Sequence, residues 1–174
     1  MSRDLDAEAL ALVRAAIDAA RAGNAVELER LLSLGVPASI RDHKGNSLVM
    51  LASYHGHQEA VRVLAARGAE LEAVNDRGQT PLQGVAFKGD VAMAELLLSV
   101  GAQVDGGGED GKTPLMFASM FNRAAMVELL LRHGADPSRA DAGGATARVI
   151  ALGMGALSAA RALGRALGFG ATTT

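Results

Sequence analysis

The chain has 174 residues, a formal net charge of −2 and a hydrophobic share of 49%, while aromatic residues make up only 3% and cysteine is absent. This composition favours one domain with a core of closely packed alanine and leucine, as stacked small helices require. It excludes structural disulfides and cysteine-ligated zinc, and the weak negative charge makes nucleic acid a poor partner.

The N-terminal residues 1–6 are acidic and contain no apolar segment of the kind that a secretory signal has. The longest uncharged stretch, residues 149–160, is too short to cross a bilayer, which takes about 20 apolar residues. We therefore expect a soluble protein that makes no membrane contact. The lack of cysteine suits a reducing compartment, and the predicted location is the cytoplasm.

Glycine recurs along the chain with a fixed period. Two series of four glycines, in phase with each other, are each spaced by 33 residues: Gly35, Gly68, Gly101 and Gly134, and Gly45, Gly78, Gly111 and Gly144. This constant period indicates a repeat array, in which one unit is too small to bury its own apolar face and must stack on its neighbours. The function is then expected on an extended surface rather than in a deep pocket.

Each internal unit opens with the residues of a tight turn followed by those of a helix start. A glycine that suits a positive φ angle precedes Ser47, Thr80 or Thr113 by two residues. These hydroxyl residues favour the N-cap position, and Pro81 and Pro114 suit the first position of a helix. The pattern predicts that a first helix begins at this point in every unit.

The end of that first helix and the course of a second helix also repeat. The first helix should end at residues that tolerate a left-handed backbone, near Gly56, Gly89 or Asn122. The second helix, with apolar residues three apart on one face, is expected at residues 59–66, 91–99 and 125–132.

Two motifs and the period give the chain a family resemblance. Thr80-Pro81-Leu82 and Thr113-Pro114-Leu115 open two units, and residues 129–136 read Leu-Leu-Leu-Arg-His-Gly-Ala-Asp. Together with the 33-residue period, these motifs resemble ankyrin repeats over about residues 9–168. The resemblance implies an all-α, ankyrin-type α-solenoid of stacked helix-turn-helix repeats with β-turn fingers.

A single repeat domain is expected over residues 1–170. We place its units at about residues 9–41 as the N-terminal cap, 42–74, 75–107, 108–140, and 141–170 as the C-terminal cap, and we expect residues 171–174 to form a disordered tail.

One slot departs from the family pattern. The histidine that usually follows Pro-Leu is replaced by Met50, Gln83, Met116 and Val149. We therefore expect the hydrogen bonds of that histidine to be absent or replaced, so that stability depends more on apolar stacking.

Residues 106–113 satisfy the pattern of a phosphate-binding loop, with Lys112 as its lysine. The repeat explains the same residues more simply, because Gly111, Lys112 and Thr113 occupy the slots of Gly78, Gln79 and Thr80. Pro114 also removes an amide donor, and the neighbouring acidic side chains would repel phosphate. A nucleotide-dependent switch through Lys112 remains the least favoured alternative.

Three histidines, His43, His55 and His57, lie close together in the sequence and could in principle bind zinc. No fourth ligand of suitable type is near them, and the resemblance places His57 in the turn between helices, where a ring nitrogen can bond to the backbone. We therefore predict no metal site and no cofactor.

The resemblance also implies which slots bind partners, namely the finger tips and the exposed ends of the first helices, which line a concave face. The finger slots hold His43, Lys44, Asn46, Asp76, Arg77, Gln79, Glu109, Asp110 and Lys112. The helix-end slots hold Tyr54, His55, Phe87, Lys88, Met120 and Phe121.

Three of the five aromatic residues in the chain, Tyr54, Phe87 and Phe121, fall at these helix-end slots. One interpretation is a row of binding anchors spaced by roughly 10 Å, the distance between packed helices. The other interpretation is that the rings only cover the neighbouring helix. The charges of the fingers run from basic at His43 and Lys44 to acidic further along, which could orient a dipolar partner.

The sequence shows no catalytic motif, so we predict a non-catalytic module, an adaptor or inhibitor, that binds one protein partner on its concave face. No nucleic acid, membrane or small-molecule substrate is expected, and a monomer is favoured over a homodimer. The leading alternative is a scaffold that self-associates through the aromatic face or the alanine-rich C-terminal cap. The richness in alanine, arginine and glycine indicates a bacterial source.

Overall fold

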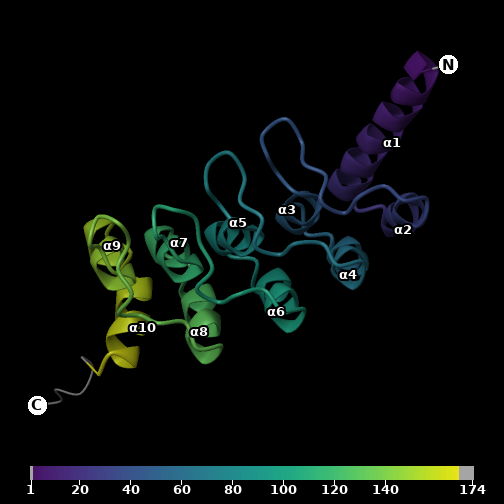
Figure 1. Ribbon diagram of the computed structural model, residues 1–174. Helices are drawn as coiled ribbons and strands as arrows, with labels where there is room; N and C mark the ends of the chain where they lie inside the picture. The colour runs from purple at the N-terminus through teal and green to yellow at the C-terminus, as the bar shows by residue number, and fades with distance from the viewer. Residues whose placement is uncertain (1, 169–174) are drawn as a thin grey trace, which may run out of the picture.

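A computed structural model describes residues 2–168, and these residues form ten helices (Figure 1). The helices are α1 (Ser2–Ala22), α2 (Ala25–Ser33), α3 (Leu48–Tyr54), α4 (Gln58–Ala66), α5 (Pro81–Lys88), α6 (Val91–Ser99), α7 (Pro114–Met120), α8 (Ala124–Arg132), α9 (Ala147–Gly153) and α10 (Leu157–Ala166). In this part of the chain, β-structure is limited to two isolated bridges, Arg41 with Ser47 and Ala140 with Thr146.

The helices form two stacked layers. The odd-numbered helices contact one another in sequence from α1 to α9, and the even-numbered helices do the same from α2 to α10. Each odd-numbered helix also packs on the helix that follows it, which gives five helix pairs in one row (Figure 1). The predicted all-α solenoid of helix-turn-helix repeats is confirmed. The exact unit boundaries stay a prediction, because helix bounds do not fix where one unit ends.

The predicted N-caps explain where the first helices begin. The hydroxyl oxygens of Ser47, Thr80, Thr113 and Thr146 each accept a hydrogen bond from the backbone amide three residues later, at 3.1 to 3.4 Å. These bonds satisfy an amide that has no partner within the helix. Pro81 and Pro114 open α5 and α7, where no amide donor is needed.

The first helices end where the glycine and asparagine slots predicted. Gly89 caps α5 with φ +80°, and Gly56 follows α3 with φ +82°. Asn122 has φ +54° after α7, a conformation that asparagine tolerates better than most residues with a side chain. The left-handed backbone turns the chain back, so that the second helix of each pair packs on the first.

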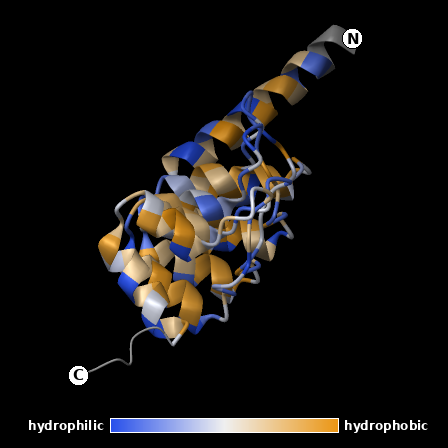
Figure 2. Ribbon diagram, turned by 90° about the vertical axis from the view of Figure 1, so that its left-hand side faces the viewer, coloured by the Kyte–Doolittle hydropathy of each residue, from blue (hydrophilic) through white to orange (hydrophobic). Residues whose placement is uncertain are grey.

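One continuous core of alanine and leucine runs through the stack, from Ala16 in α1 to Leu163 in α10. Leu82, Leu97, Leu115 and Leu130 are fully buried in it. Figure 2 shows the hydrophobic residues on the helices, while the finger loops are mostly hydrophilic. Because small side chains let the helices approach closely, five short helix pairs can share one core.

Helix α1 is longer than the sequence analysis implied. It begins at Ser2, well before the expected start of the first unit near Ala9, and its N-terminal part projects beyond the stack (Figure 1). Alanine, leucine and the acidic residues near its start all favour a helix. The repeat pattern could not reveal this extension, because no internal unit has a counterpart to it.

Side chains from each following unit cap the ends of the first helices. His57 Nε2 donates a hydrogen bond to the Arg21 carbonyl at 3.0 Å, Lys88 Nζ donates to the Tyr54 carbonyl, and Arg123 Nε donates to the Phe87 carbonyl at 3.2 Å. The carbonyls in the last turn of a helix lack partners within that helix. The ring nitrogen of His57 therefore bonds to the backbone of the preceding unit and not to its own turn.

Other contacts replace the hydrogen bonds of the missing family histidine. Gln83 accepts a hydrogen bond from the Thr80 amide at 2.8 Å and donates one to the Lys112 carbonyl of the next finger at 2.5 Å. Met50 accepts a weaker hydrogen bond through its sulfur from Asn75 at 3.3 Å. The prediction that these bonds are replaced is confirmed at both positions.

In all fingers but one, the side chain of the first residue stabilises the loop through hydrogen bonds to its backbone. Asp42, Asn75 and Asp141 each accept two backbone hydrogen bonds through Oδ1 from later residues of the same finger. In the fourth unit the same slot holds Gly108, which has no side chain. A Cβ atom at Gly108 would lie 2.1 Å from the Gly78 carbonyl oxygen, so the close approach of two fingers requires glycine there.

We predict that Gly108→Ala lowers the free energy of unfolding by about 1–3 kcal/mol, because a backbone carbonyl cannot move aside without separating the two fingers. The measurement is urea denaturation followed by circular dichroism. Gly153→Ala is the matched control, since a Cβ there meets nothing within 4 Å. Equal stability of the two variants would contradict the steric argument.

Candidate functional site: a groove between fingers and helices

A groove with a volume of about 600 Å³ lies between the fingers of the second and third units, residues 42–46 and 75–79, and the helices α3 and α5. We refer to it as the finger–helix groove. It is lined by Arg21, Asp42, His43, Lys44, Asn46, Met50, Leu51, Tyr54, His55, Asn75, Asp76, Arg77, Gln79, Gly84 and Phe87.

The groove brings together many of the residues that the sequence singled out, drawn from both fingers and from both helix ends. Those that line it are His43, Lys44, Asn46, Tyr54, His55, Asp76, Arg77, Gln79 and Phe87. The remaining candidates do not line it: Lys88, Glu109, Asp110, Lys112, Met120 and Phe121. The assignment of both sets to a binding surface stays a prediction.

Sequence reasoning did not select Arg21, Asp42, Met50, Leu51, Asn75 or Gly84 as site residues. A signal for Arg21 was present, because it stands 33 residues before Tyr54 and therefore occupies the same slot as Tyr54 and Phe87. Asp42 and Asn75 open the tight turns of the second and third units. In the structure they position the finger tips from inside the groove.

Tyr54 is the exposed aromatic residue of the groove, with 42% of its surface accessible. Its ring lies beside Gly84, where an added Cβ would be 3.7 Å from Cδ2. Lys88 Nζ stands 4.7 Å from the centre of the same ring, a favourable cation–π contact, and donates to the Tyr54 carbonyl. Contacts with the next unit therefore fix the ring in place while one face stays accessible.

Phe87 and Phe121 form an edge-to-face pair with their ring centres 4.5 Å apart and an interplanar angle of 80°. The expected spacing of roughly 10 Å is therefore wrong for this pair, because the two rings turn toward each other along the stacking direction. Phe87 is half-buried, whereas Phe121 remains 39% exposed. The pair serves packing between units and still presents apolar surface.

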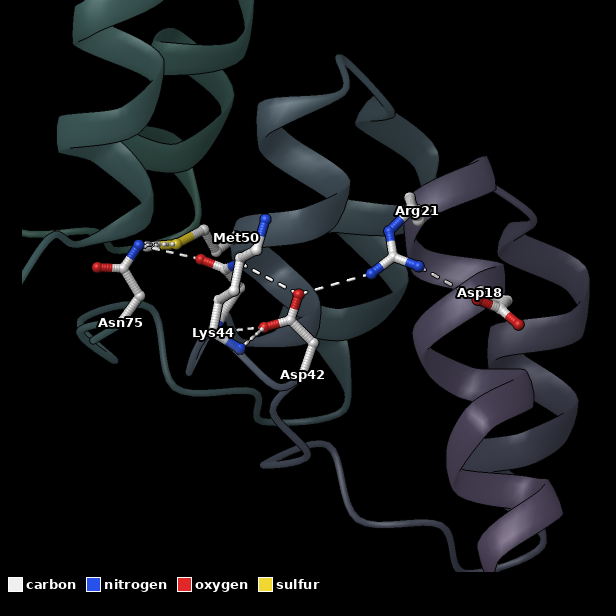
Figure 3. Close-up of polar contacts among 7 residues, drawn as sticks. Asp18, Arg21, Asp42, Lys44, Met50 and Asn75 are labelled. Carbon is white, nitrogen blue, oxygen red and sulfur yellow. Dashed lines mark hydrogen bonds and ion pairs between the residues drawn. The ribbon is translucent and has the colours of Figure 1, made fainter. Parts of the chain in front are cut away.

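Asp42 holds the finger of the second unit, residues 42–46, through hydrogen bonds to its backbone (Figure 3). Its carboxylate is 4% exposed, accepts hydrogen bonds from the Lys44 and Asn46 amides at 2.9 and 3.0 Å, and lies 3.5 Å from the Arg21 guanidinium. Burial alone would raise the pKa of Asp42, but these hydrogen bonds outweigh it and hold the pKa below its usual 3.8.

Asn75 occupies the slot of Asp42 in the next unit and links two fingers. It donates through Nδ2 to Asn46 Oδ1 at 3.0 Å and to the Met50 sulfur, as Figure 3 shows for Met50. The Asp76 amide also donates to the Lys44 carbonyl at 3.1 Å. Because the two fingers are bonded to each other, their tips form one fixed wall of the groove.

The exposed charges of the groove are mostly positive. Lys44 and Arg77 are exposed on the fingers beside the single exposed carboxylate of Asp76, since Asp42 is already bonded. Partial burial lowers the pKa of His55, and the nearby His57, Lys88 and Arg21 lower it further. His55 is therefore neutral at pH 7, so its ring can both donate and accept a hydrogen bond.

The loop that matches the phosphate-binding pattern has another structure. Lys112 Nζ is paired with Asp110 at 2.7 Å, and this hydrogen bond raises the pKa of the lysine. The glycines before it are in contact with neighbouring chain, since a Cβ at Gly107 would lie 2.2 Å from the Lys112 carbonyl oxygen. The helix that follows, α7, opens with Pro114, which has no amide to donate.

Between residues 2 and 168 there is no group of three or more His, Asp or Glu side chains placed to hold a metal ion. In the same part of the chain, none of the helices combines the length and the apolar character that crossing a membrane requires.

Comparison with known proteins identifies what the repeats are similar to. The family model for ankyrin repeats (3 copies) matches residues 16–107, 50–141 and 85–169. A protein of Pseudomonas aeruginosa named as an ankyrin repeat protein, PA3287, is 52% identical over 60 residues, which are 34% of this chain and 35% of that protein.

Ankyrin repeat domain-containing protein 29 of Homo sapiens and its counterpart in Danio rerio are 44% and 43% identical over 61 residues. Each match covers 34% of this chain and 20% of the relative. The chain thus spans about a third or less of the length of these curated relatives.

We predict that Asp42→Ala lowers the free energy of unfolding by about 1–2 kcal/mol at pH 7, because two finger amides lose their acceptor. Asp42→Asn should cost less, since Asn75 makes the same two amide contacts in the next finger. Because the pKa is lowered on folding, the stabilisation by Asp42 is complete above the unfolded value of 3.8. It disappears as the pH falls through the lower folded value.

The check is chemical denaturation of the wild type and both variants from pH 7 down to about pH 2.5. The stability difference between the wild type and Asp42→Ala should shrink only at the acidic end. A difference that does not change with pH, or an equal cost of the two variants, would show that the hydrogen-bonded carboxylate is not the cause.

We also predict that ATP and GTP at about 1 mM with Mg²⁺ leave the melting temperature unchanged, because Lys112 is engaged by Asp110 and Pro114 at the start of α7 has no amide to donate. Differential scanning fluorimetry measures this. A shift that disappears in Lys112→Ala would restore the nucleotide switch as the favoured alternative.

Proposed function

Because the chain belongs to the ankyrin repeat family, we propose that it is a non-catalytic adaptor or inhibitor that holds one protein partner in the finger–helix groove. Ankyrin repeats are generally modules for protein–protein interaction. A cytoplasmic location is part of the same proposal and is supported by the cysteine-free composition. The Pseudomonas aeruginosa relative supports a bacterial source.

The observation that carries the proposal is the exposed Tyr54 ring, held between Gly84 and Lys88 at the floor of a groove whose wall is rigid. Large aromatic side chains that stay exposed in a fixed position are typical binding anchors. Since the fingers are already bonded to each other and to the helices, little conformational entropy is lost when a partner binds.

The groove also indicates the chemistry of the partner. Lys44 and Arg77 give the finger wall a mostly positive charge, and Tyr54 and Phe87 supply apolar surface. A peptide segment with an apolar side chain and neighbouring carboxylates complements both features. The neutral ring of His55 can add one hydrogen bond to the backbone of such a segment.

The test compares three immobilised forms of the protein incubated with lysate of the source organism. They are the wild type, a groove variant with Tyr54→Ala and Arg77→Glu, and Val26→Ala as control. Val26 is exposed on α2 in the other layer and does not line the groove. The groove variant should keep the wild-type circular dichroism spectrum, because both side chains are exposed.

A protein retained by the wild type and the control but lost from the groove variant is the expected result. With that protein purified, titration calorimetry should show about 10- to 100-fold weaker binding for the groove variant. Retention of the same proteins by all three forms would place the binding surface elsewhere.

A further inference from the structure

The last helix pair presents a cleft of about 350 Å³ on its outer side, where no further described helix packs. We refer to this side as the C-terminal face. The cleft is lined by Arg148, Leu152, Leu157, Ala160, Arg161, Gly164 and Arg165. Leu152 and Leu157 are 50% and 60% exposed, so the cleft combines apolar surface with guanidinium groups.

The repeat period shows that this face differs from every internal stacking face. Arg148 stands in the slot of Val49, Leu82 and Leu115, all fully buried between units. Arg161 stands in the slot of Glu29, Glu95 and Glu128, and of Arg62 in the second unit. Each of these glutamates pairs with a side chain of the following unit, namely Arg67, His133 and Arg165 respectively.

The side chain in this slot is therefore positive at the C-terminal face, whereas Glu29, Glu95 and Glu128 are negative. Three of the four other units have a carboxylate in this slot, and the arginine of the remaining one, Arg62, is paired with Glu59 of its own helix. No Asp or Glu follows Asp141 in the sequence, so α9 and α10 carry no carboxylate that could pair with Arg161 in the same way, whereas Arg165 is paired with Glu128 of α8. Arg161 is exposed and makes no ion pair with any residue between 2 and 168.

The opposite end of the molecule offers the complementary chemistry. Residues 6–11 of α1 are all exposed and project from the stack (Figures 1 and 2). We refer to them as the free half of α1. They carry two carboxylates, Asp6 and Glu8, no cation, and Leu10 with 49% of its surface exposed. This is an acidic helix segment with an apolar side chain, as the C-terminal face requires.

We infer that the free half of α1 in one copy of this chain docks on the C-terminal face of a second copy. Asp6 and Glu8 then face Arg161, beside the existing pair of Arg165 with Glu128, and Leu10 packs against Leu152 and Leu157. The two surfaces lie at opposite ends of one molecule (Figure 1), so the contact is head-to-tail and can propagate along a row of copies.

The second copy does not simply continue the solenoid. If it did, its Leu34, which stands in the slot of Arg67 and His133, would lie opposite Arg161 of the first copy, and an apolar side chain cannot form an ion pair with an arginine. The projecting helix, which has no counterpart in internal units, supplies the carboxylates instead. This association goes beyond the proposed function, because it leaves the finger–helix groove free in each copy and would present several grooves in one assembly.

The test uses two complementary variants. The tail variant is Arg161→Glu, which places in the last unit the residue type of Glu29, Glu95 and Glu128 in the same slot. The head variant is Asp6→Lys with Glu8→Lys. The matched control is Arg62→Glu, which changes an exposed arginine in the same slot of an internal unit. Molar mass is measured by analytical ultracentrifugation between about 5 µM and 1 mM protein at low salt, where ion pairs are least screened.

The wild type and the Arg62→Glu control should gain mass with concentration, and added salt should weaken this association. Each of the two variants alone should self-associate at least about tenfold more weakly than the wild type. An equimolar mixture of the two should form a mixed complex, because the unchanged head of the tail variant meets the unchanged tail of the head variant. The lysines introduced by Asp6→Lys and Glu8→Lys also complement the glutamate introduced by Arg161→Glu, so that association is restored. Formation of this complex also shows that both variants are folded.

A wild type that stays monomeric over the whole range would overturn the inference. Undiminished self-association of either variant would overturn it as well, because the contact would then use another surface. Neither result would bear on the groove, whose test depends on Tyr54 and Arg77.

Discussion

No helix pair of this protein can bury its apolar side alone, and this constraint governs the structure. Each unit has helices of only seven to ten residues, apart from α1, and a core built from alanine and leucine. The neighbouring unit supplies the missing packing partner. It also supplies the hydrogen-bond partners, since His57, Lys88 and Arg123 each cap the end of a helix in the unit before.

The rigidity of the groove follows from the same dependence between units. Tyr54 keeps its position because its ring lies beside Gly84 and Lys88 donates to its carbonyl, and both residues belong to the next unit. The finger wall is fixed in the same way, through Asn75 and the Asp76 amide. A surface for a partner thus arises as a by-product of stacking, without any loop that must order on binding.

The first and last units of the stack have a neighbouring unit on one side only, and their sequences differ from those of the internal units for that reason. Arg148 and Arg161 replace residues that would otherwise attract a further unit. At the other end α1 extends past the repeat with acidic residues. End faces that match no internal face limit the growth of a solenoid, and here their opposite charges also set the orientation of the inferred contact.

The sequence by itself determined the period, the helix pairs, the N-caps and the left-handed turns, because these depend on local residue types such as Thr80, Pro81 and Gly89. It also selected much of the groove, since the slots of Tyr54 and His43 recur every 33 residues. Only the tertiary structure decided the contact of Phe87 with Phe121, the role of Gly108 beside Gly78, and the embedding of Asp42 near Arg21. These features join residues of different units, and their distances depend on how closely the units stack, which no local pattern encodes.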